Sequence, residues 1–195
     1  NDVDIERASE IEAVIHHDLM AEIKTWAEQC PNAGAIIHLG ATSMDILDNM
    51  DALRLKEALS LICQRVEALL SSLLFKMEEW EDTPCMAFTH IQPAEVTTVG
   101  HRLAQSAQDL AEDLEQLRAT REAIRGKGMK GAVGTSASYR ELLAGTGMTA
   151  LQLEERVMDE LGLAAYSAAT QVYSRKQDLR VGQALSNVAA TLHKL

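Results

Sequence analysis

The chain has 195 residues, which is enough for one sizeable domain or slightly more, and 29 acidic against 18 basic side chains give it a net charge of −11. This charge argues against general binding to nucleic acids or anionic membranes, which requires a basic surface. No apolar run approaches the roughly 20 residues of a membrane span and no signal peptide is recognisable, so we expect no membrane association. The three cysteines, Cys30, Cys63 and Cys85, lie far apart without CxxC spacing, which is typical of reduced thiols in a cytoplasmic protein.

Apolar side chains recur at helical spacing through the first thirty residues, in two stripes that meet near His16 and His17. Neighbouring histidines on a helix point about 100° apart, so this pair does not easily face one ligand. Because HExxH and other paired spacings are also absent, we expect no metal site, and an exposed polar joint is the plainer interpretation. The stripes consist of Ile5, Ala8, Ile11 and Ile15, and of Leu19, Ile23 and Trp26.

The segment from Ala35 to Asp45 begins apolar and ends polar. Gly40 gives the backbone freedom, and Thr42 or Ser43 is well placed to cap a helix that follows. Capping alone would explain these hydroxyls. A helix N-terminus with free hydroxyls and amides would also bind an anion, and the residues are compatible with either interpretation.

Two long amphipathic helices are expected next, from Asp45 to about Glu81 and from Glu95 to about Arg125. The first contains no proline or glycine and should extend on the order of 55 Å. Two long helices with a short connection should lie antiparallel in a bundle, and their uncovered apolar stripes predict an oligomer. We therefore expect an all-α fold, an elongated long-helix bundle.

The connection between these helices contains the polar joint Thr89-His90-Ile91-Gln92-Pro93-Ala94. A joint that only turned the chain would more often use glycine, asparagine or aspartate. An imidazole exchanges protons near neutral pH, so His90 is the first candidate for a chemical role. On its own, a histidine in a turn is more often structural or solvated.

The stretch from residue 118 to 138 reverses the overall charge, with five basic side chains close together and only Glu122 against them. Glycines surround its lysines and let backbone amides approach a ligand, so the stretch suggests an anionic small molecule. A flexible solvated loop is the alternative, and the order of a Walker loop is absent. The basic residues are Arg118, Arg121, Arg125, Lys127 and Lys130.

A shorter helix is expected from Met148 to about Leu161, closed by Gly162, and a last helix follows Gln171-Val172-Tyr173-Ser174-Arg175-Lys176. Ser174 could cap this last helix. Arg175 and Lys176 would lie in its first turn, where the helix dipole disfavours cations. The mismatch hints at a function, although an exposed pair would tolerate it.

Four motifs, taken in order, resemble those of the adenylosuccinate lyase family within the fumarase/aspartase superfamily. The His90 motif alone would indicate only the superfamily, whereas the four together indicate this family over nearly the whole chain. The resemblance implies three helical domains, with residues 1–42 ending the first and residues 43–195 forming part of the central bundle. It also implies a cytoplasmic homotetramer with active sites shared between subunits, and no metal or organic cofactor. The motifs are His38–Asp45, Thr89–Ala94, Lys130–Thr135 and Gln171–Lys176.

The reaction that the resemblance implies is elimination of fumarate from an anionic nucleotide. The substrates would be adenylosuccinate, giving AMP, and the succinyl-aminoimidazole-carboxamide ribotide of purine synthesis. The chemistry needs a base, groups that stabilise a dianionic intermediate, and an acid for the leaving nitrogen. By motif, His90 would be the general acid and His17 would assist it. The substrate-binding positions carried over are His38, Thr42, Ser43, Thr89, Gln92, Lys130, Thr135, Gln171 and Arg175.

Two departures from the family pattern matter. The family commonly has arginine where this chain has His16, so the ligand contact of that arginine is in question here or becomes pH-dependent. The signature loop with the family's catalytic serine is absent and would lie beyond Leu195. Because the chain also begins at Asn1 without methionine and ends within a helical pattern, we expect a fragment that is inactive alone.

Two alternatives stay open at this point. One is another lyase of the superfamily, such as argininosuccinate lyase, against which the His38–Asp45 and Gln171–Lys176 segments argue. The other is a non-catalytic helical assembly domain, which the bundle helices alone would equally suit.

Overall fold

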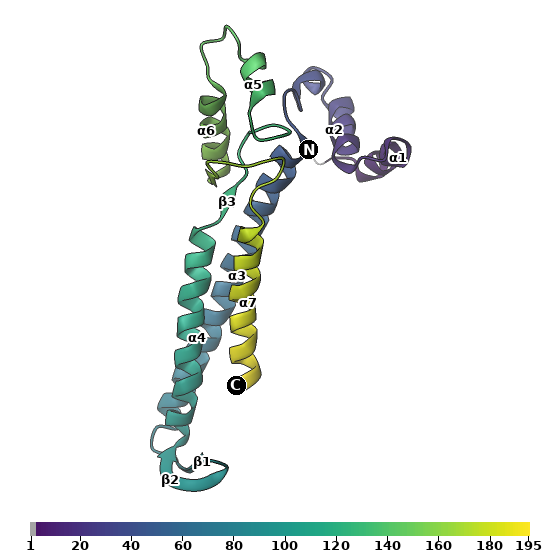
Figure 1. Cartoon of the computed structure of the whole chain (residues 1–195). Coiled ribbons are helices and arrows are strands. Elements are labelled where there is room, and N and C mark those ends of the chain that lie inside the picture. The colour runs from purple at the N-terminus through teal and green to yellow at the C-terminus, as the bar shows by residue number, and fades with distance from the viewer. Residues whose placement is uncertain (1–2) are drawn as a thin grey trace. The chain divides into compact units, whose positions relative to one another are not determined.

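The computed structural model describes residues 3–195, which form seven α-helices, one 3-10 helix and four short strands (Figure 1). The predicted all-α fold class is confirmed, since the strands make only two small pairs. The chain divides into two compact units. Unit 1 contains the residues up to Leu53 together with Arg125–Ser174, and unit 2 contains Arg54–Ile124 together with Arg175–Leu195.

Unit 1 gathers the short helices around the beginning of α3. Helix α6 begins with a capping box between Thr149 and Gln152 and ends at Gly162 in the left-handed region, which confirms the helix predicted there. Strands β3 and β4 pair in parallel. The elements are α1 (Ile5–Ile15), α2 (Asp18–Gln29), η1 (Gly34–Ile36), β3 (Arg125–Gly126), α5 (Ala137–Leu142), α6 (Ala150–Leu161) and β4 (Ala164–Ala165).

The predicted joint near His16 and His17 is the end of one helix and the beginning of the next. His16 adopts a left-handed conformation, φ 54°, and ends α1. His17 is the N-cap of α2, and its Nδ1 accepts a hydrogen bond from the amide of Met20 at 3.3 Å. Histidine tolerates the left-handed region better than most residues do. The pair therefore has a local structural role in turning the chain.

Unit 2 is built from three helices: the greater part of α3 (Ser43–Glu79), α4 (Val99–Glu122) and α7 (Lys176–Lys194). Helices α4 and α7 lie side by side (Figure 1). Arg118 of α4 pairs with Glu67 of α3 at 2.8 Å, and Arg121 contacts Ser60 at 3.4 Å. Residue numbers rise along α3 while those opposite fall along α4, so the two long helices are antiparallel, as predicted.

The polar joint predicted between these helices is a β-hairpin. Strand β1 (Pro84–Thr89) pairs with β2 (Gln92–Thr98) in an antiparallel register that leaves His90 and Ile91 as the turn. Both turn residues have positive φ, 49° and 63°. A two-residue loop with positive φ at both positions is a type I′ turn, the commonest short hairpin connection.

The predicted start of the second long helix at Glu95 is wrong, because α4 begins at Val99. The run Val96, Thr97 and Thr98 is β-branched and continues the strand. Thr98 then caps the helix, its hydroxyl accepting a hydrogen bond from the amide of His101 at 3.2 Å. Val96 and Val99 have the spacing of a helical stripe, but Val96 belongs to strand β2 and Val99 to helix α4.

Helix α3 contains an 18-residue window of mean hydropathy 1.5 with at most two charged side chains. By length and composition alone this helix could cross a membrane, so the expectation that no segment is suitable is wrong. Only 22% of the window is buried within the described chain, and a single helix of this composition is weak evidence for a membrane span. The window alone therefore does not indicate a membrane protein.

Candidate active site

The residues predicted for the site fall in both units. The first group surrounds the beginning of α3, and the second lies on the hairpin and at the beginning of α7. Unit 1 holds His17, His38, Thr42, Ser43, Lys130, Thr135 and Gln171, and unit 2 holds Thr89, His90, Gln92 and Arg175.

The beginning of α3 is not capped by a hydroxyl. Within residues 3–195 neither Thr42 Oγ1 nor Ser43 Oγ forms a hydrogen bond, although both residues are half-buried. The amide of Thr42 instead donates to the carboxylate of Asp45 at 3.2 Å. The capping interpretation of these hydroxyls is therefore not what the structure adopts, and both hydroxyls remain available at a helix N-terminus, where anions are stabilised.

The carboxylate of Asp45 is buried, with 1% of the residue exposed, and it collects donors from far along the chain. Its Oδ1 lies 2.6 Å from the Lys127 ammonium. Its Oδ2 accepts from the Tyr139 hydroxyl at 2.9 Å. The remaining donors are the amides of Lys130 at 3.1 Å to Oδ1, Gly131 at 3.1 and 3.0 Å to the two oxygens, and Thr42.

The alternative of a flexible solvated loop is wrong for Lys127 and Lys130, which are both buried. Lys127 pairs with Asp45, and Lys130 Nζ lies 2.5 and 2.6 Å from the two oxygens of Glu154 on α6. Charges close in the sequence did not reveal these ion pairs, because the carboxylates that neutralise the two lysines come from distant segments, α3 and α6. The predicted contact of Lys130 with substrate stays a prediction, and in this structure its ammonium is neutralised by Glu154.

Glycine is required where this loop approaches other segments closely. Gly134 has φ 81°, and a Cβ there would lie 1.8 Å from the carbonyl oxygen of Ala169. At Gly128, with φ 87°, a Cβ would meet a Glu154 oxygen at 2.3 Å. No side chain fits either position, so the glycines are explained by folding of the loop.

His38 lies half-buried just before α3, and its Nδ1 is buried with no hydrogen-bond partner among the described residues. Burial lowers the pKa of His38, the charge of Asp45 partly opposes this, and His17 lowers it further. The imidazole is therefore neutral near pH 7. A buried ring nitrogen without a partner is uncommon and is suited to a ligand contact.

His17 is exposed, and its Nδ1 is the acceptor that caps α2, which places the ring proton on Nε2. The same Nδ1 lies 3.4 Å from an Asp18 oxygen. We favour the cap, because that oxygen already accepts from the amide of Leu19 at 2.7 Å. The structure thus brings His17 and His38 close enough to influence each other while giving His17 a local function.

The exposed tip of the hairpin carries His90. Its imidazole forms no hydrogen bond with any of residues 3–195. Thr89 and Gln92 are directly paired across the hairpin and are also exposed. The tip therefore presents three polar side chains to solvent.

The other predicted residues are exposed as well. Thr135 and Gln171 lie at the surface of unit 1. Arg175 occupies the N-cap position of α7 without a side-chain cap bond, and the expected cap by its neighbour Ser174 stays a prediction. The Arg175 guanidinium lies 3.6 Å from Asp178 one turn further along, which reduces its conflict with the helix dipole.

Sequence reasoning missed the buried polar residues that organise unit 1. Asp45, Asp48 and Asn49 are spaced i, i+3 and i+4 and therefore share one face at the beginning of α3. Asp48 accepts from the amide of Tyr173 at 2.8 Å, and Asn49 bonds both the amide and the carbonyl of Gly128, at 3.0 and 3.3 Å. Polar residues repeating on one face of an apolar helix were the signal that could have found them.

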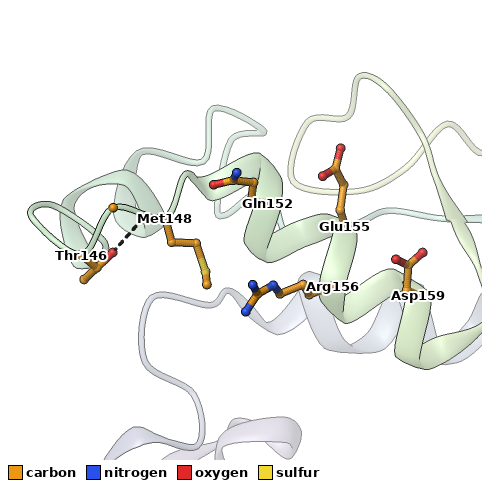
Figure 2. A pocket seen from close by; sticks show the side chains of 7 residues that line it. Thr146, Met148, Gln152, Glu155, Arg156 and Asp159 are labelled. Carbon is orange, nitrogen blue, oxygen red and sulfur yellow. Dashed lines mark hydrogen bonds between the residues drawn. The ribbon is translucent and has the colours of Figure 1, made fainter.

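Several hollows in the described part of the chain are lined by none of the predicted residues. One, of 420 Å³, follows α6 and the loop before it in unit 1 (Figure 2). Figure 2 shows acidic, basic and amide side chains spread along it. No group of three histidine, cysteine or acidic residues suited to a metal occurs within residues 3–195. The hollow is lined by Thr146, Gly147, Met148, Gln152, Glu155, Arg156 and Asp159.

Comparisons with known proteins agree on one family. The family model described as "Lyase" matches residues 3–195. The curated adenylosuccinate lyase of Schistosoma mansoni is 40% identical over 195 residues, covering 99% of this chain and 41% of that protein. That of Saccharomyces cerevisiae is also 40% identical, covering 100% of this chain and 40% of that protein. This chain thus spans about two fifths of the length of the curated relatives that it matches.

The solved structures most useful for comparison share the fold. A fumarate lyase from Mesorhizobium sp. BNC1 superimposes with a TM-score of 0.87 at 24% identity, over 100% of this chain and 44% of that one. A 3-carboxy-cis,cis-muconate lactonizing enzyme from Pseudomonas putida gives 0.81 at 25% identity, over 98% and 43%.

Proposed function

The chain belongs to the lyase family, and on this premise we propose that the full-length protein is an adenylosuccinate lyase. It would eliminate fumarate from adenylosuccinate, giving AMP, and from the succinyl-aminoimidazole-carboxamide ribotide of purine synthesis. The observation that carries the proposal is the 40% identity to two curated adenylosuccinate lyases over essentially the whole of this chain. Neither argininosuccinate lyase nor a non-catalytic assembly domain is favoured by any comparable likeness.

The beginning of α3 is the proposed seat of the succinyl carboxylate. The hydroxyls of Thr42 and Ser43 have no partner within residues 3–195, and the first amides of a 37-residue helix add the positive end of its dipole. Two hydroxyls at such a position suit a carboxylate, whose negative charge grows as the carbanion forms next to it. His38, Lys130, Thr135 and Gln171 are proposed as further contacts of the same nucleotide substrate.

His90 is the proposed general acid. When the C–N bond breaks, its electron pair goes to the leaving nitrogen, which takes up a proton from the imidazolium. The exposure of His90 and its lack of a hydrogen-bond partner among residues 3–195 support a role toward a ligand, as do the exposed Thr89 and Gln92 beside it. His17 would assist in orienting or protonating the substrate, and Arg175 would bind it. The base that removes the carbon-bound proton is not among the residues proposed here.

A homotetramer with active sites shared between subunits is proposed for the whole protein. The hairpin exposes large apolar side chains, with Ile91 93%, Val96 74% and Phe88 61% exposed. Side chains of this kind at the tip of a hairpin suit burial against another copy of the chain. We further propose a cytoplasmic location and a domain boundary between Thr42 and Ser43, where α3 begins.

The proposal is tested with the full-length protein and two substrates. Incubation with adenylosuccinate should release fumarate and AMP in equal amounts, and argininosuccinate should release no fumarate. EDTA should leave the rate unchanged, because every group proposed for the reaction is a side chain. Fumarate release from argininosuccinate alone would assign the protein to the other branch of the superfamily, and release from neither would refute the proposal.

A further inference from the structure

The buried carboxylate of Asp45 joins the beginning of α3 to a loop more than eighty residues away in sequence. Through Oδ2 it holds the amide of Thr42. Through Oδ1 it holds the ammonium of Lys127, and both oxygens contact the amide of Gly131. One side chain therefore fixes the helix start and the glycine-rich loop against each other.

The Asp45 carboxylate supplies one half of a helix cap, because it accepts a hydrogen bond from the amide of Thr42, the residue before the helix. The other half would be a Thr42 hydroxyl that accepts from the amide of Asp45. That amide instead bonds the carbonyl of Thr42 at 3.0 Å, and the hydroxyls of Thr42 and Ser43 make no bond within residues 3–195. Asp45 thus fixes the backbone beside the two free hydroxyls that the proposed function uses to bind a carboxylate.

The position of the Asp45 carboxylate is itself closely determined. A carboxylate has about four lone-pair sites, and five donors make six contacts with this one. The Tyr139 hydroxyl is a dependable donor, because burial raises its pKa and the neighbouring Asp45 charge raises it further. The ring of Tyr139 also lies under Gly40, where a Cβ would be 3.3 Å from it.

We propose that Asp45 is a positioning residue, which holds the backbone of Thr42 and Ser43 in the geometry that receives a substrate carboxylate, and that Tyr139 fixes Asp45 in turn. The inference rests on the proposed function, because it concerns the same helix start. The competing explanation is that Asp45 only stabilises unit 1. The two differ in which kinetic constant changes when the network is weakened.

Tyr139→Phe is the most informative variant in the full-length protein, because it removes one hydrogen bond to Asp45 and keeps the ring and the Lys127 ion pair. We expect the KM for adenylosuccinate and the Kd for fumarate to rise about tenfold, the value of one hydrogen bond to a charged group. We expect the Kd for AMP to change less than about twofold, because AMP lacks the succinyl carboxylates. Asp45→Asn should show the same pattern more strongly if it folds.

Met158→Ala is the matched control, since Met158 is buried in unit 1 and supplies none of the six hydrogen-bond contacts of Asp45. It should lower the melting temperature at least as much as Tyr139→Phe without raising the KM. A KM that is unchanged in Tyr139→Phe, or that rises equally in Met158→Ala, would overturn the positioning role.

A second measurement separates failure of this inference from failure of the proposed function. If the wild-type protein releases no fumarate, the proposed function fails, and amide hydrogen exchange still tests Asp45. Exchange at residues 42–45 and 130–131 should be at least about tenfold faster in Tyr139→Phe than in wild type, the factor expected for one lost hydrogen bond. Equal exchange at these amides in the two proteins would refute the positioning role whatever the activity.

Discussion

The beginning of α3 and the β-hairpin both carry proposed site residues, but they hold them in opposite ways. At the beginning of α3, a buried network of charged groups and amides holds the backbone in place. Its side chains, from Asp45, Lys127 and Tyr139, are all less than 3% exposed. The hairpin has no such support within the described chain, and its tip presents His90 and Ile91 to solvent. The first region is held by contacts within the described chain, whereas the side chains at the tip of the second are exposed.

The backbone of the hairpin tip supports this contrast. Ile91 has a φ of 63°, and this left-handed backbone conformation is unfavourable for a β-branched residue. Such strained residues are found mainly at functional sites, where the rest of the structure holds them in place. Asparagine or glycine would make the same turn with less strain. We infer that a large apolar side chain beside the proposed acid serves association or catalysis and not the stability of the hairpin.

Removing the countercharge beneath α3 should give the largest effect on stability. Lys127→Met leaves the Asp45 carboxylate buried without its cation, which should destabilise the full-length protein by about 3–5 kcal/mol. Thermal or urea unfolding measures this loss. Arg118→Met removes the exposed pair with Glu67 and is the control, with an expected loss below about 1 kcal/mol. Similar losses in the two variants would mean that the buried network is not what holds unit 1.

His90→Ala should show the reverse pattern, with a large kinetic effect and little change in stability. Loss of a general acid should lower kcat at least ~100-fold. The melting temperature should hardly change, because the imidazole is exposed and makes no hydrogen bond within residues 3–195. Steady-state kinetics and thermal unfolding of the same preparation measure both. Near-normal turnover would remove His90 from the mechanism.

Ile91→Gly should relieve the strain in the turn. A left-handed residue with a Cβ costs about 1–2 kcal/mol, and glycine gives part of this back through its greater freedom when unfolded. In the 195-residue chain on its own, where the tip has no other copy to pack against, we expect a net stabilisation of at most about 1 kcal/mol, seen as slower amide exchange in β1 and β2. Ile91→Val keeps the strain and should leave exchange unchanged, so equal exchange in all three proteins would contradict the strained turn.

The smallest expected effect is a pH dependence from His38. Its folded pKa is depressed by burial, so below about pH 6.5 the unfolded chain takes up a proton that the folded chain resists. The stability present above this pH is therefore lost as pH falls through the folded pKa. When the pH is lowered from 7.5 to 5.5, the melting temperature should fall further in the wild-type protein than in His38→Gln. An equal fall would show that His38 does not resist protonation in the folded protein.

The sequence was sufficient to predict the long helices, because periodicity is strong over many turns. The first was expected over Asp45–Glu81 and is found over Ser43–Glu79. The hairpin could not be found this way, because His-Ile is not a turn dipeptide and its strands are short. Val96 and Val99 fit a helical stripe equally well, and only the pairing of β1 with β2 decides between the two structures.

The ion-pair partners of the buried lysines could not be predicted from the charges close to them in the sequence. Lys127 and Lys130 seemed unopposed, yet their carboxylates stand 82 and 24 positions away, at Asp45 and Glu154. Local charge therefore predicted a cationic surface where the fold makes a neutral interior. The motif that contains Thr42 and Ser43 was recognisable, but the contact with Asp45 that fixes its backbone became visible only in the structure.

We propose that these two regions serve one active site from different copies of the chain, and subunit complementation is the test of this proposal. Full-length His90→Ala and a Thr42→Ala/Ser43→Ala double variant should each be nearly inactive. After the two are dissociated together and reassembled, some sites receive an intact hairpin from one subunit and an intact helix start from another. Recovery of up to about a quarter of wild-type activity is expected, since each position is intact in half of the subunits. No recovery in mixed oligomers of confirmed composition would contradict the claim, because it would place both regions of a site in the same subunit.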